Sequence, residues 1–138
     1  MKLIFLDVDG VLNSHGNPKI EHDKVLLLNE IVKETGAKVV ITSTWRIGQS
    51  IDTLQKTLND LDFVGNIVGK TVMLWSRGEE IDDYLYQQNL TSQEDVKYIV
   101  IDDLWVSGHE YKQLKTKTKY GLTKWHVDLA IMMLNVDE

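Results

Sequence analysis

The chain has 138 residues, of which 43% are hydrophobic and 26% are charged, and its formal net charge is −6. This size and composition are typical of a globular domain, and we expect residues 1–138 to form a single one. The absence of cysteine excludes disulfides, thiolate metal sites and a cysteine nucleophile. No apolar run approaches the roughly 20 residues of a membrane helix, and Asp7 interrupts the only early one. We therefore expect a cytoplasmic protein that does not bind membranes.

The first predicted elements form a strand–helix–strand unit. Residues 3–6 are a continuous apolar run, typical of a strand buried on both faces. After a loop over residues 14–23, apolar residues recur at helical spacing over 25–32, and Gly36 is the expected stop. Residues 38–41 are a second strand. Two strands joined by a helix are expected to be parallel, with a right-handed crossover.

The alternation continues to the end of the chain. We predict helices over 47–61 and 78–88, a strand over 96–101, a short strand near 111–118, and a last helix with Thr123 as N-cap. Residues 62–75 are irregular, and no element is predicted there. The order of elements indicates a doubly wound, Rossmann-like α/β fold, with a parallel sheet and helices on both faces.

Polar side chains follow three of these strands. Asp7 and Asp9 end the first strand, and residues two apart on an extended chain point the same way. Gly10 then supplies a turn. The alternative is a polar turn that happens to hold two aspartates. Because ligands of open α/β sheets lie beyond the carboxyl ends of the strands, we favour a ligand site here.

The other strand ends complete a chemical set. Thr42 and Ser43 follow the second strand, and Asp102 and Asp103 follow the strand over 96–101. Carboxylates are suited to Mg²⁺ and hydroxyls to phosphate oxygens. Arg77, just before a predicted helix, is placed to supply a positive charge.

Four stretches resemble, in the right order, the motifs of the haloacid dehalogenase-like (HAD) superfamily of phosphotransferases. They are Asp7-Val-Asp-Gly-Val, Val39-Val-Ile-Thr-Ser, a basic residue before a helix, and Ile101-Asp-Asp. More narrowly, three strings resemble the small HAD domains associated with RNA-repair proteins: Thr42-Ser-Thr-Trp-Arg, Arg77-Gly-Glu-Glu-Ile and Gly121-Leu-Thr. The resemblance implies a Mg²⁺-dependent phosphatase that forms an aspartyl-phosphate.

The resemblance also implies a role for each catalytic residue. Asp7 would be the nucleophile, and Asp9 would act as general acid towards the leaving oxygen and then as base towards water. Thr42 would hydrogen-bond the transferring phosphoryl group, and Arg77 would stabilise its negative charge. Lys70 is the alternative to Arg77 for this basic position.

The same resemblance assigns the binding residues. The ligands of Mg²⁺ would be Asp7, the backbone carbonyl of Asp9, and Asp102, with Asp103 as a further ligand or an orienting group. The phosphorylated substrate would lie against Gly10, Ser43 and Arg46, although Arg46 has the alternative of pairing with a surface carboxylate.

The sequence leaves little room for a cap domain. An open site favours large substrates, such as the phosphate end of a nucleotide chain or a phosphoprotein, unless a second subunit closes it. Nucleotide or polynucleotide phosphate ends are the leading expectation, and the oligomeric state stays open. The competing hypothesis is a module with the HAD fold that has no catalytic activity and serves in binding or assembly. An EF-hand-type Ca²⁺ loop fits poorly, because Val11 and Leu12 occupy ligand positions.

Two surface features have open interpretations. Five lysines and no acid lie between Lys112 and Lys124, which indicates either a phosphate-binding stripe or a strand edge protected by lysines. The net negative charge argues against electrostatic binding of duplex nucleic acid. Trp45, Trp75 and Trp105 either stack on a base or pack at the rim of the core.

Overall fold

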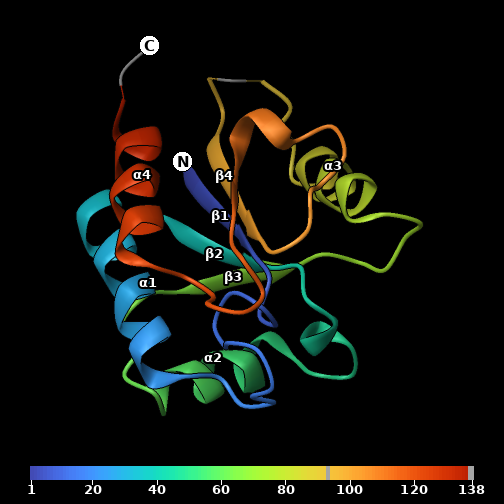
Figure 1. Cartoon of the computed structure of the whole chain (residues 1–138). Helices are drawn as coiled ribbons and strands as arrows, with labels where there is room; N and C mark the ends of the chain where they lie inside the picture. The colour runs from blue at the N-terminus through green and yellow to red at the C-terminus, as the bar shows by residue number, and fades with distance from the viewer. Residues whose placement is uncertain (93, 137–138) are drawn as a thin grey trace.

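The computed structural model describes residues 1–92 and 94–136, so residues 93, 137 and 138 of the predicted domain lie outside the described part. The described residues form a five-stranded parallel sheet in the order β3-β2-β1-β4-β5 (Figure 1). The strands are β1 (Lys2–Leu6), β2 (Lys38–Ile41), β3 (Ile67–Lys70), β4 (Lys97–Asp102) and β5 (Gln113–Lys115). The α-helices are α1 (His22–Thr35), α2 (Ile51–Asn59), α3 (Arg77–Gln87) and α4 (Lys124–Asn135), and the 3-10 helices are η1 (Thr44–Arg46) and η2 (Glu110–Lys112).

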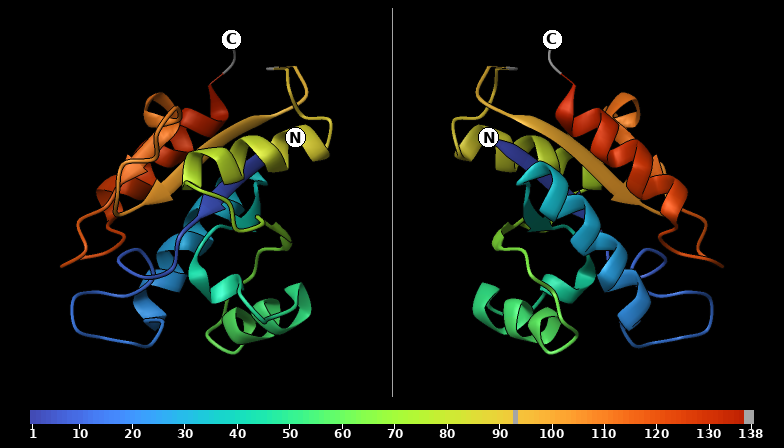
Figure 2. Two further views of the ribbon diagram at one scale, coloured as in Figure 1. Left: turned by 90° about the vertical axis from the view of Figure 1, so that its right-hand side faces the viewer. Right: turned by 90° about the vertical axis from the view of Figure 1, so that its left-hand side faces the viewer.

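Each face of the sheet has its own hydrophobic core, because successive side chains of a strand point to opposite faces. Ile4 and Leu6 belong to the core covered by α1, α2 and α4. Leu3 and Phe5 belong to the core covered by α3. The two views of Figure 2 show these faces, one with α3 in front and the other with α1 and α4. The predicted doubly wound α/β fold is confirmed.

The predicted helix over residues 47–61 is shorter in the structure. The chain leaves η1 at Arg46, and α2 begins only at Ile51. Ser50 is the N-cap of α2, and its hydroxyl accepts a hydrogen bond from the Thr53 amide. A serine at this position satisfies an amide that has no partner within the helix, which fixes the later start.

The segment without a predicted element contains β3, at the edge of the sheet. Gly69 lies in this strand, where a Cβ would come within 2.5 Å of the Tyr84 hydroxyl oxygen on α3. A four-residue edge strand that contains glycine has little strand propensity. The strand forms because it pairs with β2 and packs against Tyr84 of α3. Neither contact can be predicted from the local sequence.

The connections at the carboxyl ends of the strands are short. Residues 7–21 join β1 to α1, and residues 71–76 join β3 to α3. Neither connection holds a separate cap, in agreement with the predicted minimal cap. Within the described residues, no helix combines the length and the apolar character that crossing a membrane requires.

Candidate active site

The carboxyl ends of β1, β2 and β4 bring the first site residues together. The Asp7 amide donates to the Ile101 carbonyl at 3.0 Å, and the Thr42 amide donates to the Leu6 carbonyl at 3.0 Å. The parallel ladder therefore continues one residue beyond β1 and β2, and it fixes the backbone from which these side chains project. Asp7 and Asp102 are 4% and 1% exposed, so their carboxylates face the protein interior rather than bulk water.

Three carboxylates converge at this edge. One oxygen from each of Asp7, Asp102 and Asp103 lies within 4.8 Å of the other two. Burial, followed by the charge of Asp102, raises the pKa of Asp7 to about 8, even though Arg77 opposes the shift. Burial also raises the pKa of Asp102. Such a group of hard oxygen donors carries more negative charge than the protein balances, which is the environment a divalent cation requires.

Gly10 makes room for this cluster. Its φ is +79°, in the left-handed region that favours glycine. A Cβ at this position would lie 2.2 Å from Oδ2 of Asp103. The structure thus shows Gly10 against a metal-binding candidate, which differs from the substrate contact expected for it. The same Asp103 oxygen accepts a hydrogen bond from the Thr118 hydroxyl at 2.7 Å.

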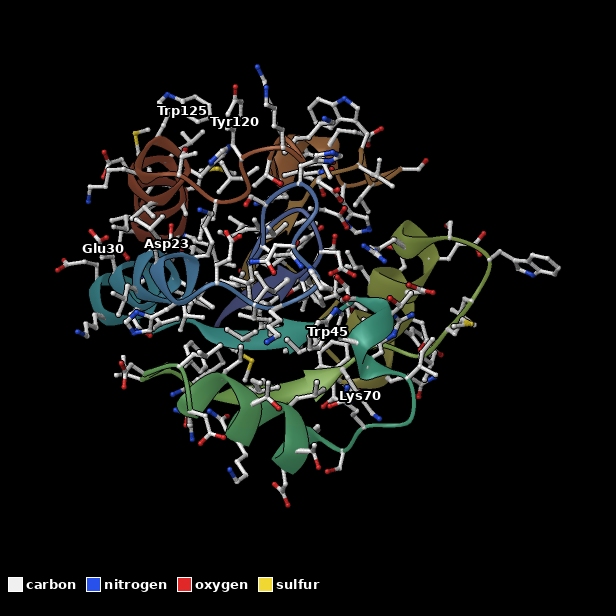
Figure 3. All side chains as sticks on the ribbon, turned by 60° about the horizontal axis from the view of Figure 1, so that its bottom comes forward. Asp23, Glu30, Trp45, Lys70, Tyr120 and Trp125 are labelled. Atoms are coloured by element: carbon white, nitrogen blue, oxygen red, sulfur yellow. The ribbon has the colours of Figure 1, made fainter. Side chains whose placement is uncertain are left out.

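Arg77 supplies the positive charge of the cluster. Its Nη1 donates to Oδ2 of Asp102 at 2.6 Å and lies 3.2 Å from Oδ1 of Asp7. Ser76 caps α3 by accepting from the Glu79 amide, which places Arg77 at the helix start. Lys70 instead donates to the carbonyls of residues 46 and 49 and extends toward the turn after η1 (Figure 3). The geometry favours Arg77 over Lys70 for the basic role.

Asp9 has an environment opposite to that of Asp7, although only one residue separates them. It is exposed, and its carboxylate accepts hydrogen bonds from Asn13 Nδ2 at 2.9 Å and from the Trp45 indole N–H at 3.2 Å. The Asn13 side-chain oxygen in turn accepts from the Gly10 amide at 2.8 Å. These contacts hold an exposed carboxylate in one orientation, as a proton donor and acceptor needs.

The two hydroxyls after β2 differ in what they can do. Thr42 is fully buried, and its Oγ1 has no hydrogen-bond partner among the described residues. Ser43 Oγ accepts from the Trp45 amide and caps η1. An unpartnered buried hydroxyl is rare, so Thr42 is the hydroxyl left available for a phosphate oxygen. Oγ1 of Thr71, after β3, is likewise buried without a partner in the described part of the chain.

Arg46 does not have the position expected of a substrate contact. It is 4% exposed, and its Nη2 lies 3.0 Å from Oε2 of Glu80 on α3. Its Nε donates to the Thr71 carbonyl at 2.8 Å, and its Nη1 donates to the Thr42 carbonyl. The guanidinium therefore joins β2, β3 and α3. The structure therefore favours the alternative that Arg46 pairs with a carboxylate over a contact with substrate, although the partner is buried rather than at the surface.

Several residues of the site were not predicted. Asn13 and Thr118 orient Asp9 and Asp103, and Glu80 neutralises Arg46. Asn13 is four residues from Asp9 in the sequence, so its contact with Asp9 could have been predicted from that spacing. Thr118 and Glu80 meet their partners through the fold, so local sequence gives no signal for them.

The tryptophans near the site have unequal surroundings. Trp75, just before α3, is 96% exposed, so rim packing does not describe it. Trp105 lies two residues after Asp103 and is 63% exposed. Trp45 is half-buried, packs against the core below α2 and bonds Asp9.

A parallel sheet whose central strands end in converging carboxylates, with one arginine at the next helix start, defines a HAD-like domain. Residues 3–127 match the profile of the family described as the HAD domain in Swiss Army Knife RNA repair proteins, and the chain belongs to this family. Membership indicates a hydrolase-type activity, and members of this superfamily typically use a metal ion. No curated protein and no solved structure matches the chain.

Proposed function

We propose that the chain is a Mg²⁺-dependent phosphomonoester hydrolase with Asp7 as its nucleophile. The observation that carries this proposal is the convergence of Asp7, Asp102 and Asp103 on one point, with a single guanidinium to balance them. When all three carboxylates are ionised, as attack by Asp7 requires, one arginine leaves an excess of two negative charges. A divalent cation balances this excess, and it also attracts a phosphate.

The residues fit Mg²⁺ by their chemistry. Asp7, Asp102, Asp103 and the carbonyl of Asp9 would hold the ion, all through oxygen. The bound ion would neutralise the phosphoryl oxygens and lower the pKa of Asp7, which burial raises to about 8. The nucleophile must be ionised to attack, so the raised pKa itself supports a cation-dependent reaction.

The protein residues divide the reaction into two steps. In the first, an Asp7 oxygen forms a bond to phosphorus while the bond to the leaving oxygen breaks, and Asp9 donates its proton to that oxygen. In the second, Asp9 takes a proton from water, whose oxygen attacks phosphorus and releases the Asp7 carboxylate. Thr42 Oγ1 and Arg77 would hydrogen-bond the transferring phosphoryl group.

For substrate, we propose the phosphate end of a nucleotide or of a nucleic-acid strand. The short connections over residues 7–21 and 71–76 leave no separate domain to enclose a small molecule. The family is described by its occurrence in RNA repair proteins, which supports the same choice. We also propose that the protein is cytoplasmic. Both a Mg²⁺-dependent reaction and a chain without cysteine are compatible with that compartment.

The test is phosphate release from p-nitrophenyl phosphate, mononucleotides, and oligonucleotides with a 3′- or 5′-phosphate. We expect turnover that requires Mg²⁺, is lost on chelation with EDTA, and falls at least about a thousandfold in Asp7→Asn. Asp23→Asn, an exposed aspartate on α1, is the matched control and should keep full activity. Folded wild type that releases no phosphate from any substrate would favour the hypothesis of a module without catalytic activity instead.

A further inference from the structure

We propose that the surface formed by Trp105, Lys115, Lys117, Lys119, Tyr120 and Trp125, called here the basic-aromatic surface, binds single-stranded nucleic acid beside the active site. The inference rests on the proposed function in one respect: the bound strand would be oriented with its terminal phosphate toward Asp7. Binding itself requires no catalysis, so the two proposals can fail separately.

Positive charge on this surface is concentrated and unbalanced. The surface contains Lys115, Lys117 and Lys119, and no acid occurs from residue 111 to residue 127. None of these three lysines forms an ion pair with a carboxylate in the described part of the chain. By contrast, Lys124 pairs with Glu30 at 2.7 Å and with Asp128 at 3.3 Å. A concentration of free lysines in a chain of net charge −6 indicates a local site for anions.

Exposed aromatic rings accompany the lysines. Tyr120 and Trp125 are 55% and 67% exposed and project from the same side of the molecule (Figure 3). The Lys115 Nζ lies 6.0 Å from the Trp105 ring centre, and the Lys119 Nζ lies 5.5 Å from the Tyr120 ring centre. Surfaces that bind single strands combine lysines, which contact phosphates, with rings on which unpaired bases stack.

A cavity lies between these groups. It has a volume of about 290 Å³, and its lining includes Lys115, Lys117, Tyr120 and Trp125. This volume is at the small end of ligand pockets, which span about 300–1,000 Å³, and suits one planar group rather than a large ligand. A base inserted here would lie against the rings, with its phosphate within reach of the lysines.

The same segment reaches the active site. Lys115 and Lys117 line the cavity, and the threonines that follow them bond residues of the active site. Thr116 Oγ1 donates to the Gly10 carbonyl at 2.6 Å, and Thr118 Oγ1 donates to Asp103 at 2.7 Å. The basic-aromatic surface and the carboxylate cluster are therefore two sides of one segment.

Edge protection explains only part of this pattern. Strand β5 is at the edge of the sheet but contains just three residues, Gln113–Lys115. Lys117 and Lys119 follow its last residue, in a part of the described chain that is paired only by an isolated bridge between Lys117 and Gly121. A duplex is a poor occupant, because its bases are stacked away from protein rings. A phosphopeptide provides one phosphate but no succession of planar bases.

The test measures binding without turnover. A fluorescently labelled single-stranded RNA with hydroxyl groups at both ends is titrated with wild type, and anisotropy is followed at several KCl concentrations. The test variants are Lys117→Gln/Lys119→Gln and Tyr120→Ala, all at exposed positions. The matched control is Lys33→Gln/Lys38→Gln, which removes the same charge at two exposed positions, in the last turn of α1 and at the start of β2.

We expect the double variant at the surface to weaken binding several-fold at low salt. It should also reduce the slope of log K against log salt by about 1.4, at about 0.7 for each lost phosphate contact. Tyr120→Ala should weaken binding at least about fivefold and leave this slope unchanged. The control should match wild type in both measurements.

Three results would overturn the proposal: no binding by wild type, equal losses in the test and control double variants, or displacement of the RNA by a phosphoserine peptide as efficiently as by unlabelled RNA. The last result would favour a phosphoprotein as the partner.

A parallel assay with p-nitrophenyl phosphate reports on the proposed function alone. We expect Lys117→Gln/Lys119→Gln to hydrolyse this small substrate like wild type while its KM for phosphorylated RNA rises. RNA binding as expected, without hydrolysis of either substrate by wild type, would support the binding surface and contradict the phosphatase.

Discussion

The two halves of the sheet edge at the active site balance their charges differently. Beyond β1 and β4, the carboxylates of Asp7, Asp102 and Asp103 converge, and the guanidinium of Arg77 pairs with the first two of them. Beyond β2 and β3, Arg46 has Glu80 and two backbone carbonyls as partners. The first half is left with excess negative charge, whereas the buried charges of Arg46 and Glu80 in the second half neutralise each other.

This difference separates binding groups from structural ones. A buried charge without full compensation destabilises a fold, so its presence indicates a role that requires a ligand. A buried ion pair with further hydrogen bonds needs no ligand. Substitutions in the first half should therefore change activity and the response to Mg²⁺, whereas substitutions in the second half should change stability. The four predictions below test this contrast.

The largest effect is expected for Arg46→Met. The substitution leaves buried Glu80 without its ion-pair partner, although the Leu74 amide still donates to it. We expect a loss of about 3–5 kcal/mol in the free energy of unfolding, measured by urea denaturation. Mg²⁺ should not restore this loss, because the unpaired carboxylate is outside the cluster. Arg46→Met/Glu80→Gln should recover part of the stability. A variant with wild-type stability and a raised KM would restore Arg46 as a substrate contact.

Arg77→Ala should have the largest effect on kcat/KM among substitutions of basic residues. We expect a fall of about a hundredfold to a thousandfold, since the guanidinium would no longer stabilise the phosphoryl charge. Lys70→Ala is the control, and it should change kcat/KM little because Lys70 contacts only backbone carbonyls in the structure. The reverse outcome would assign the basic role to Lys70. Steady-state kinetics with p-nitrophenyl phosphate distinguish the two.

Thr42→Val should reduce activity without reducing stability. The Thr42 hydroxyl is buried and unpartnered in the described residues, so its removal breaks no hydrogen bond seen in the structure. We expect kcat/KM to fall about tenfold to a hundredfold, the loss of a hydrogen bond to a charged group. Thermal unfolding should show an unchanged or slightly higher Tm. A lower Tm with unchanged kinetics would make Thr42 a structural residue.

The smallest effect concerns the stability of the metal-free protein. Because burial raises the pKa of Asp7 from 3.8 to about 8, the folded state favours the protonated carboxyl. The contribution of this group to stability is then fully present below about pH 4 and is lost as the pH rises through about 8. In EDTA, we expect Asp7→Asn to have a higher Tm than wild type at about pH 9, on the order of 5 °C, and a difference that shrinks as the pH falls toward about 4.

Added Mg²⁺ gives this prediction a second measurement. It should raise the Tm of wild type at about pH 8 and raise that of Asp7→Asn much less, because the ion stabilises the state that binds it. Equal increases in both proteins would place the ion elsewhere. A metal-free Asp7→Asn variant that is less stable than wild type at about pH 9 would contradict the excess charge of the cluster.

The positions of Asp7, Thr42 and Asp102 could be predicted because each follows a strongly apolar strand. Once three strands are recognised as parallel, their carboxyl ends must share one edge, and residues far apart in the sequence must meet there. This reasoning needs no knowledge of individual contacts. The prediction succeeds for strands such as β1, β2 and β4, which the hydrophobic pattern alone identifies.

The surroundings of Arg46 could not be predicted in the same way. Its partners are Glu80 on α3 and the carbonyl of Thr71, which follows β3. Strand β3 has no clear pattern, because it is short and contains Gly69 beneath Tyr84. Without that strand in place, a basic residue next to a predicted phosphate site is most simply read as a substrate contact. Its burial is a consequence of tertiary packing.

The central claim is that Asp7 carries the phosphoryl group, and trapping of the covalent intermediate tests it most directly. Wild type would be mixed with Mg²⁺ and substrate, quenched with acid and reduced with borohydride, which converts an aspartyl-phosphate into homoserine. Mass spectrometry then locates the modified residue. We expect homoserine at position 7, dependent on both Mg²⁺ and substrate. Phosphate turnover with position 7 unmodified, or modification of another carboxylate, would contradict the account.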